Sequence, residues 1–278
     1  MLSQPVILGH EDLSRDQLLL DRGLHYGDGL FETIAAVAGD MPLLEQHLAR
    51  LSRDASQLLG HYPQALIEQR LQAVRQLLQS HSEPHVVKIL ITRGVSGRGY
   101  GYDPNTPLRV LAFIYPYQPP SLDKRLAGLN VIHCQHRLAD RGWLGSIKHC
   151  NRLDQVVART EVSQFSADEG LMYGDDGQLI EATSANVAVK LHGRWLTPEI
   201  AHIGIAGVAR QCMIDAGTLT VANISRASLA EATALVLINS VQGIMPVRAT
   251  PDRVYDESPE QILDELSQGL VPHMRGQW

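Results

Sequence analysis

Lys148 is the residue whose chemistry stands out first. The chain of 278 residues has 24 lysines and arginines, and only Lys88, Lys124, Lys148 and Lys190 are lysines. Arginine stays protonated, whereas a lysine amine can lose its proton and form a Schiff base with a carbonyl group. A chain that favours arginine is expected to keep lysine where the amine matters, or by chance. Lys124 and Lys190 are expected to be solvated, and Lys88, in a strand, could be either.

The surroundings of Lys148 favour a reactive amine. Asn151 is a suitable helix N-cap, and Asp154, three residues later, completes a capping pattern. Lys148 would then precede a helix N-terminus, where the macrodipole disfavours the ammonium form. A solvated loop lysine is the alternative that these residues leave open.

Two segments could bind an anion through backbone amides. Residues 204–211, "GIAGVARQ", place small residues at the start of a helix, whose first N–H groups can bind phosphate. Residues 239–243, "NSVQG", follow a buried strand and could form a second group of amides. Arg50, on a helix beside an apolar position, could clamp a phosphate bidentately. The alternatives are a helix cap, a turn and a solvated arginine.

Glu181 ends a strand and is followed by small residues. A partly buried carboxylate there would need a cationic partner, and an edge-strand acid is the alternative. Histidines and cysteines such as His133, Cys134 and His136 could suggest a metal site. No zinc-finger or H-E-x-x-H spacing is present, so we expect no metal.

Composition excludes several classes of function. The formal net charge is −6, so no global basic field would hold a nucleic acid. No apolar run approaches the roughly 20 residues of a membrane span. Three cysteines without regular spacing indicate free thiols in a reducing compartment, and the N-terminus does not resemble a signal peptide. We therefore expect a cytoplasmic protein.

Apolar patterning predicts mixed helices and hairpins without a steady βαβ repeat. We expect strands near 30–37, 85–94, 107–116 and 129–138, helices near 42–60, 63–80, 151–164, 207–217 and 259–268, and turns near 38–40, 175–177 and 192–193. Three prolines within residues 115–121 favour a linker there. The prediction is an α+β protein with an N-terminal domain over 1–114, a linker over 115–121 and a C-terminal domain over 122–278.

The motifs together resemble the fold type IV pyridoxal-phosphate (PLP) enzymes, which include D-amino acid and branched-chain aminotransferases. Six segments occur in the family's order: "DRGLHYGDGLFET", "HLARL", "IKHCNRLDQVVA", "EATSANV", "GIAGVAR" and "INSVQGIMPV". The resemblance implies a smaller N-terminal α/β sandwich-like domain, a larger C-terminal mixed β-barrel-like domain that carries Lys148, and a homodimer.

The resemblance also implies roles for individual residues. Lys148 would be the catalytic lysine that forms the Schiff base with PLP, and Glu181 would pair with the protonated pyridine nitrogen. The phosphate would be bound by Arg50 and by backbone amides at Val208, Ala209, Ser240 and Val241. The aminotransferases carry a hydroxyl residue where Ala209 stands, so only its backbone amide could contribute.

Two segments resemble the lyases of the family, which convert 4-amino-4-deoxychorismate to 4-aminobenzoate and pyruvate in folate synthesis. "IKHCNRLDQVV" matches K-H-x-N-R-L-[DE]-Q, and "TRGVSGRGYG" matches R-G-x-[SG]-G-R-G-Y. The implied reaction is Schiff-base exchange, proton abstraction and elimination of enolpyruvate. An aminotransferase for D- or branched-chain amino acids, and a non-catalytic PLP- or metabolite-binding protein, are the alternatives.

The lyase substrate has two carboxylates. Arg93 and Arg98, in the polar loop, are candidates to bind one of them, because the guanidinium fork matches a carboxylate. The alternative is that both face solvent. His25 and Tyr26 could line the same pocket, although Tyr26 could equally belong to the core.

Overall fold

The computed structural model describes residues 4–11 and 13–270, which group into two compact units. The first unit extends to Gln118 and also includes Ile147–Asn151, and the second contains Pro119–Ser146 and the chain from Arg152 onward. The sequence-based boundaries instead placed residues 147–151 in the C-terminal domain. Whether each unit is a domain that folds independently stays a prediction.

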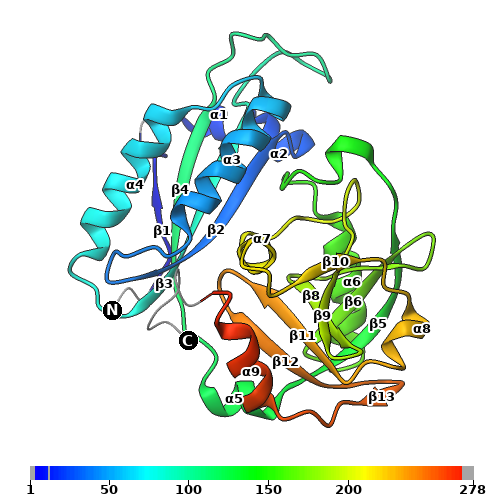
Figure 1. The fold of residues 1–278 in the computed structure, drawn as a ribbon. Coiled ribbons are helices and arrows are strands. Elements are labelled where there is room, and N and C mark those ends of the chain that lie inside the picture. Colours follow the sequence, from blue (N-terminus) through cyan, green and yellow to red (C-terminus); the bar gives the residue numbers. More distant parts are fainter. Residues whose placement is uncertain (1–3, 12, 271–278) are drawn as a thin grey trace. The chain divides into compact units, whose positions relative to one another are not determined.

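The first unit is a four-stranded antiparallel sheet covered by helices. The sheet order is β1 (Val6–Leu8), β4 (Arg109–Pro116), β3 (Pro84–Thr92) and β2 (Gly29–Val37). Two longer helices, α3 (Leu44–Leu59) and α4 (Gln64–Leu78), pack against one face of it (Figure 1). The expected strands and helices of this unit are confirmed, but β1, α1 (Arg15–Leu19) and α2 (Arg22–Tyr26) were not predicted.

Buried and less buried side chains alternate along much of β2 and β3, so the two faces of the sheet differ. Leu30 and Ile34 of β2 belong to the hydrophobic core, together with Ile89 of β3. Successive side chains of a strand point to opposite faces, so Phe31 of β2 and Lys88 of β3 lie on the face away from this core. The helix-covered face therefore supplies stability, and the other face presents an aromatic ring and an amine.

The segment Ile147–Asn151 pairs with the free edge of β2. His149 forms an antiparallel bridge with Leu30. The amide of Phe31 donates to the carbonyl of Lys148 at 3.2 Å, and the amide of Cys150 donates to Gly29 at 2.9 Å. These backbone bonds explain why the segment groups with the first unit.

The second unit contains a nine-stranded mixed sheet. Eight strands follow the order β10 (Thr220–Ala222), β9 (Arg194–Pro198), β8 (Asn186–Leu191), β11 (Ala234–Asn239), β12 (Gly243–Thr250), β5 (Leu129–Leu138), β6 (Glu169–Gly174) and β7 (Leu179–Ala182), and β13 (Arg253–Val254) pairs with β12. Strand β7, at one end of this order, also packs against β8 and β9. The sheet therefore curls back on itself, and the expected barrel-like α+β architecture is confirmed.

The helices of the second unit are α5 (Leu122–Ala127), α6 (Leu153–Gln164), α7 (Val208–Asp215), α8 (Arg226–Leu229), α9 (Pro259–Ser267) and the 3-10 helix η1 (Gly142–Leu144). Helix α5 was not predicted, and it follows a proline-rich connection shorter than expected, because β4 continues to Pro116. The turns expected near Asp175–Gly177 and His192–Gly193 are confirmed. Within the described residues, no helix is both long and apolar enough to span a membrane.

Candidate active site

Lys148 is positioned by the backbone of its own segment. Its amide donates to Oδ2 of Asp54 on α3 at 3.1 Å. The neighbouring residues Ile147 and His149 are buried, so the segment is anchored on both sides of the lysine. The Nζ atom of Lys148 lies 4.2 Å from the centroid of the Phe31 ring. A flexible lysine side chain is thus held over an aromatic face that favours a cation without neutralising it.

The capping pattern predicted next to Lys148 is wrong. Helix α6 begins at Leu153, its N-cap is Arg152, and no side chain caps it. Asn151 instead donates its side-chain amide to the carbonyl of Gly27 at 3.0 Å. Asp154 accepts from His136 at 2.8 Å. Asn151 thus links the segment Ile147–Asn151 to the residues just before β2. This long-range hydrogen bond takes the place of the local helix cap that the sequence predicted.

The other three lysines differ in their exposure and in their charged partners. Lys190 was expected to be solvated, but it forms ion pairs with Glu257 and Glu265, so that prediction is wrong. Lys124 is exposed, as expected. Lys88 is half-buried, and its Nζ lies 4.8 Å from the centroid of the Phe31 ring, the same ring that Lys148 approaches.

Arg50 lies in a buried ionic cluster on the core side of the first unit. Its Nε and Nη2 donate to the two oxygens of Glu32 at 2.8 and 2.6 Å. Nδ1 of His47 lies 2.6 Å from Oε2 of the same carboxylate. Since a guanidinium has five donor hydrogens, Glu32 fixes its plane and uses part of its capacity. Phosphate binding by Arg50 stays a prediction.

The contacts within this cluster shift the pKa values of its acidic and imidazole groups. Burial alone would raise the pKa of the Glu32 carboxyl, but the charge of Arg50 and the hydrogen bonds from His47 and Arg50 lower it to about 2. Burial lowers the pKa of His47, and Glu32 opposes this effect only in part. The native cluster therefore holds an ionised Glu32, and it disfavours charging of His47.

Glu181 lies in the second unit and is held by neutral donors. It is buried, its Oε2 accepts from the amide of Ile205 at 2.9 Å, and its Oε1 accepts from the side chain of Gln155 on α6 at 3.0 Å. These bonds fix the carboxylate in one orientation. Asn186 fixes the same loop by donating to the carbonyl of Ile205 at 2.8 Å and accepting from the amide of Gly207 at 3.0 Å.

The N-terminus of α7 has no side-chain cap. Gly207 is the N-cap and has no side chain to fill the position. In the described part of the chain, the amides of Val208 and Ala209 have no hydrogen-bond acceptor. A Cβ atom at Gly207 would collide with Oδ1 of Asn186, so the close approach of this asparagine requires glycine. The first turn therefore offers two donors and the positive end of a helix dipole.

The turn at Ser240 and Val241 is already bonded internally. Oδ1 of Asn239 accepts from the amides of Val241 and Gln242 at 3.0 and 2.6 Å. A phosphate would have to share or displace this acceptor at Val241. The structure thus gives this turn a side-chain cap that the sequence prediction lacked, and its phosphate-binding role stays a prediction.

A cavity of about 720 Å³ lies within the second unit, and its volume is typical of a small-molecule site. Its polar wall includes Gln155, Glu169, Thr183, Ser184, Asn239 and Gln242. Gln155 contacts Glu181, and Asn239 closes the turn at Ser240 and Val241. The cavity therefore lies next to several of the predicted cofactor-binding groups of this unit.

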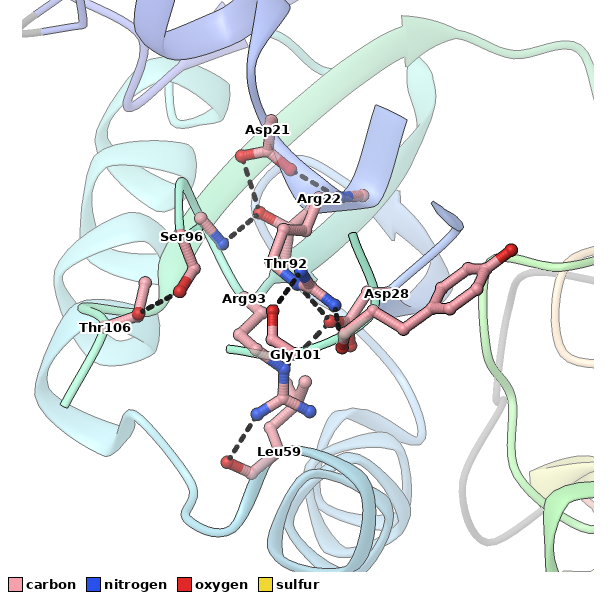
Figure 2. Close-up of polar contacts among 12 residues, drawn as sticks. Asp21, Arg22, Asp28, Leu59, Thr92, Arg93, Ser96, Gly101 and Thr106 are labelled. Carbon is pink, nitrogen blue, oxygen red and sulfur yellow. Dashed lines mark hydrogen bonds and ion pairs between the residues drawn. The ribbon is translucent and has the colours of Figure 1, made fainter. Parts of the chain in front are cut away.

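Arg93 has a structural position rather than a solvated one. It is buried, its Nε donates to Oδ2 of Asp28 at 2.9 Å, and its Nη2 donates to the carbonyl of Leu58 at 2.7 Å. It thus ties the end of β3 to the last turn of α3 (Figure 2). These contacts use the donors that a substrate carboxylate would need. Of the two candidate arginines, only Arg98 is exposed.

His25 and Tyr26 have different surroundings. His25 is exposed, and its Nε2 lies 2.8 Å from the carbonyl of Leu19. The ring of Tyr26 is half-buried and meets Tyr100 of the polar loop edge-on, with 5.7 Å between the centroids. Tyr26 therefore contacts the loop that carries Arg98, whereas His25 is fastened to the chain before α2. Substrate binding by either residue stays a prediction.

Sequence reasoning missed Arg22, which holds that loop. Its guanidinium donates to the carbonyls of Gly99, Tyr100 and Gly101, each at 3.0 Å. Its Nε donates to Asp28 at 2.8 Å, and Figure 2 shows Arg22 with Asp28 and Gly101. The polar loop named above comprises residues 93–107, between β3 and β4. One buried cation thus fixes three successive carbonyls of an otherwise exposed segment. An arginine at the start of a short helix and an aspartate six residues later, just after that helix, were the available sequence signal.

Replacing Arg22 with methionine is expected to release the polar loop. Hydrogen bonds to a charged group contribute about 1.5–3 kcal/mol, so local opening should become about 10- to 100-fold more frequent. Trypsin cleavage after the exposed Arg98, followed by mass spectrometry, should accelerate by this factor. The matched control is Arg15→Met, on exposed α1. Equal cleavage rates in both variants would show that Arg22 does not restrain the loop.

The histidines and cysteines do not converge on a metal site. In the described ranges, no three His, Cys, Asp or Glu side chains lie close enough to ligate one ion. Nδ1 of His133 lies 2.6 Å from the hydroxyl of Tyr173, whereas Cys134 is buried and directed at α6.

The match to a family model defines the class of protein. Residues 29–250 match the family model described as amino-transferase class IV, so the chain belongs to this family. The protein is a PLP-dependent enzyme of fold type IV. In the second unit, the N-terminus of α7 suits a phosphate and the buried carboxylate of Glu181 suits a ring nitrogen. In the first unit, the anchored Lys148 suits an aldehyde.

The individual relatives include both lyases and aminotransferases. The chain is 27% identical to aminodeoxychorismate lyase of Vibrio harveyi, over 92% of this chain and 93% of the relative. It is similar to the crystal structure of 4-amino-4-deoxychorismate lyase from Pseudomonas aeruginosa, with 33% identity, a TM-score of 0.80 and coverage of 97% and 98%. It is also 27% identical to D-alanine aminotransferase of Bacillus licheniformis, over 70% of this chain and 67% of the relative.

Proposed function

We propose that this protein is a 4-amino-4-deoxychorismate lyase, which forms 4-aminobenzoate and pyruvate. The main support is the extent of the similarity. In the sequence comparison, the lyase of Vibrio harveyi matches 92% of the chain, whereas the D-alanine aminotransferase of Bacillus licheniformis matches 70% of it. Among the solved structures, the lyase from Pseudomonas aeruginosa is 33% identical to the chain, whereas a fold IV transaminase from Curtobacterium pusillum, which also covers 91% of the chain, is 26% identical. The two lyase-like segments, around Lys148 and in the polar loop, point in the same direction.

The chain's own residues suit the proposed reaction. When bound, PLP supplies an aldehyde that joins the substrate amine and a ring that accepts an electron pair. Nζ of Lys148 would remove the proton from the amine-bearing carbon of the substrate. The C–O bond to the enolpyruvyl group then breaks, the six-membered ring of the substrate becomes aromatic, and Lys148 can return a proton to the leaving enolpyruvate, which becomes pyruvate.

The remaining predicted residues would bind and orient the cofactor. The carboxylate of Glu181, fixed by Gln155 and Ile205, would accept a hydrogen bond from the pyridine N–H and keep that nitrogen protonated. The amides of Val208 and Ala209 would donate to the phosphate, with Arg50 as a further donor. Ser240 and Val241 would contribute only if the bonds to Asn239 rearrange.

An aminotransferase for D- or branched-chain amino acids is the second candidate. Its support is the similarity to D-alanine aminotransferases and to a putative branched-chain-amino-acid aminotransferase. The cofactor-binding residues serve both reactions, so they do not distinguish between them.

The product distinguishes the two functions. Purified holoenzyme is incubated with 4-amino-4-deoxychorismate, and 4-aminobenzoate and pyruvate are measured by chromatography. We expect both in equal amounts, without an added 2-oxo acid. Transfer of the amino group from D-alanine or a branched-chain amino acid to 2-oxoglutarate, with no 4-aminobenzoate formed, would reverse the assignment.

We further propose a cytoplasmic homodimer. The three cysteines are free thiols, which fits a reducing compartment. Helix α6 exposes apolar side chains at Leu153, Val156 and Val157, which suits contact with a second copy. Light scattering that shows only monomer at micromolar concentration would rule out the dimer.

A further inference from the structure

The sheet face beside Lys148 carries a second amine without an assigned role. Lys88 lies on β3, where it pairs in register with Thr33 of β2 and Phe113 of β4, and it is diagonal to Phe31. Its Nζ and that of Lys148 both lie within 5 Å of the centroid of the Phe31 ring, at 4.8 and 4.2 Å. The two amines therefore share one aromatic ring, and all the groups belong to the first unit.

Among the described residues, the ammonium of Lys88 has no acidic partner. Within the part of the chain that the structure describes, it forms no ion pair and its amine donates no hydrogen bond, although the residue is half-buried. A partly buried charge is costly unless it is paired, and a cation–π contact compensates for only part of that cost. Lys190, by contrast, has two carboxylates around it. Lys88 is therefore a cation with unused capacity for an anion.

We propose that Lys88 binds a carboxylate of the substrate whose amine reacts at Lys148. This inference rests on the proposed function, because aminodeoxychorismate brings carboxylates close to the reacting amine. The ring of Phe31 positions the ammonium of Lys88, whose Nζ lies 4.8 Å from the ring centroid, without supplying an oxygen acceptor for its three N–H donors. The role predicted for Arg93 thus passes to Lys88, since Arg93 is already bonded to Asp28 and Leu58.

Binding of chorismate to the holoenzyme tests the proposal without any turnover. Chorismate has the two carboxylates of the substrate and a hydroxyl in place of the amine, so it can bind without joining the cofactor. In calorimetric titration, Lys88→Met is expected to raise Kd about 10- to 100-fold, the value of one lost charge-assisted contact. Lys88→Arg, which keeps the charge, should stay within a few-fold of wild type. The matched control is Arg75→Met, an exposed cation on α4.

Steady-state kinetics and the cofactor spectrum provide the second readout. Lys88→Met should raise KM for aminodeoxychorismate by a similar factor and leave kcat nearly unchanged. The pH titration of the visible cofactor band should also stay unchanged. A shifted titration with an unaltered chorismate Kd would mean that Lys88 tunes Lys148 instead, and the proposal would be overturned.

Failure of this proposal can be told apart from failure of the proposed function. Equal chorismate affinity in wild type and Lys88→Met, or no chorismate binding by wild type, would overturn the role of Lys88 even if 4-aminobenzoate is formed. A wild type that binds chorismate through Lys88, but forms no 4-aminobenzoate, would overturn the lyase assignment alone.

Discussion

Replacing Lys148 with arginine or alanine is expected to lower the rate of 4-aminobenzoate formation by at least about 10⁴-fold. One residue would lose both its covalent bond to the cofactor and its acid–base role, and the second alone is commonly worth about 10²–10⁴. Arginine retains a positive charge over Phe31 but cannot form a Schiff base. Borohydride reduction followed by peptide mass spectrometry should find PLP attached at residue 148 in wild type and no attached PLP in either variant.

The matched control for Lys148 is Lys190→Arg. Lys190 is held by Glu257 and Glu265, and arginine can keep both ion pairs, so covalent PLP and turnover should stay at the wild-type level. If Lys148→Arg retained a reducible PLP adduct and full activity, Lys148 would not be the reactive lysine.

Breaking the buried cluster around Glu32 is expected to have the largest effect on stability. Glu32→Gln leaves the buried guanidinium of Arg50 without a counter-charge, and removal of one partner from a buried pair typically costs about 3–5 kcal/mol. The midpoint of urea unfolding, followed by circular dichroism, should fall accordingly. The double variant Glu32→Gln with Arg50→Met removes both charges and should recover much of the loss. A single variant as stable as wild type would show that the pair contributes nothing.

The same cluster predicts how stability depends on pH. The pKa of Glu32 is about 2 in the native protein and about 4.3 in an unfolded chain. Its contribution is therefore complete above about pH 4.3 and is lost as the pH falls towards 2. The lowered pKa of His47 acts with the same sign, because acid charges this histidine more readily in the unfolded chain. Glu32→Gln should flatten the fall in unfolding free energy between pH 5 and about 2.

Long patterned elements were readable from the sequence, whereas short ones were not. Strands β2, β3 and β4 carry runs of β-branched and aromatic residues, and α3 and α4 repeat leucine at helical spacing, so pattern and structure agree. Elements such as β1, with three residues, or α5, with six, are too short for a period to appear. Tertiary packing decides these segments.

Side-chain partners were harder to predict than elements. Arg22 meets carbonyls 77 to 79 residues away, and Arg93 meets Leu58, 35 residues back. A local sequence pattern does not predict contacts between residues so far apart along the chain. Arg50 was singled out as an anion-binding residue, yet its nearest anion is Glu32 of the same chain. The residue type indicated that Arg50 binds an anion. Only the fold showed that Glu32 already occupies part of its hydrogen-bonding capacity.

The pairing of Ile147–Asn151 with β2 has a consequence for synthesis on the ribosome. The first unit is translated as far as Gln118 before the strand-like piece that covers its open edge exists. Until residue 151 emerges, the nascent sheet keeps a row of unpaired amides and carbonyls, which is a hazard for self-association. The segment that closes this edge also carries Lys148, the proposed reactive lysine. A chain truncated before this segment would lose that amine and also the backbone pairing that protects the sheet from aggregation.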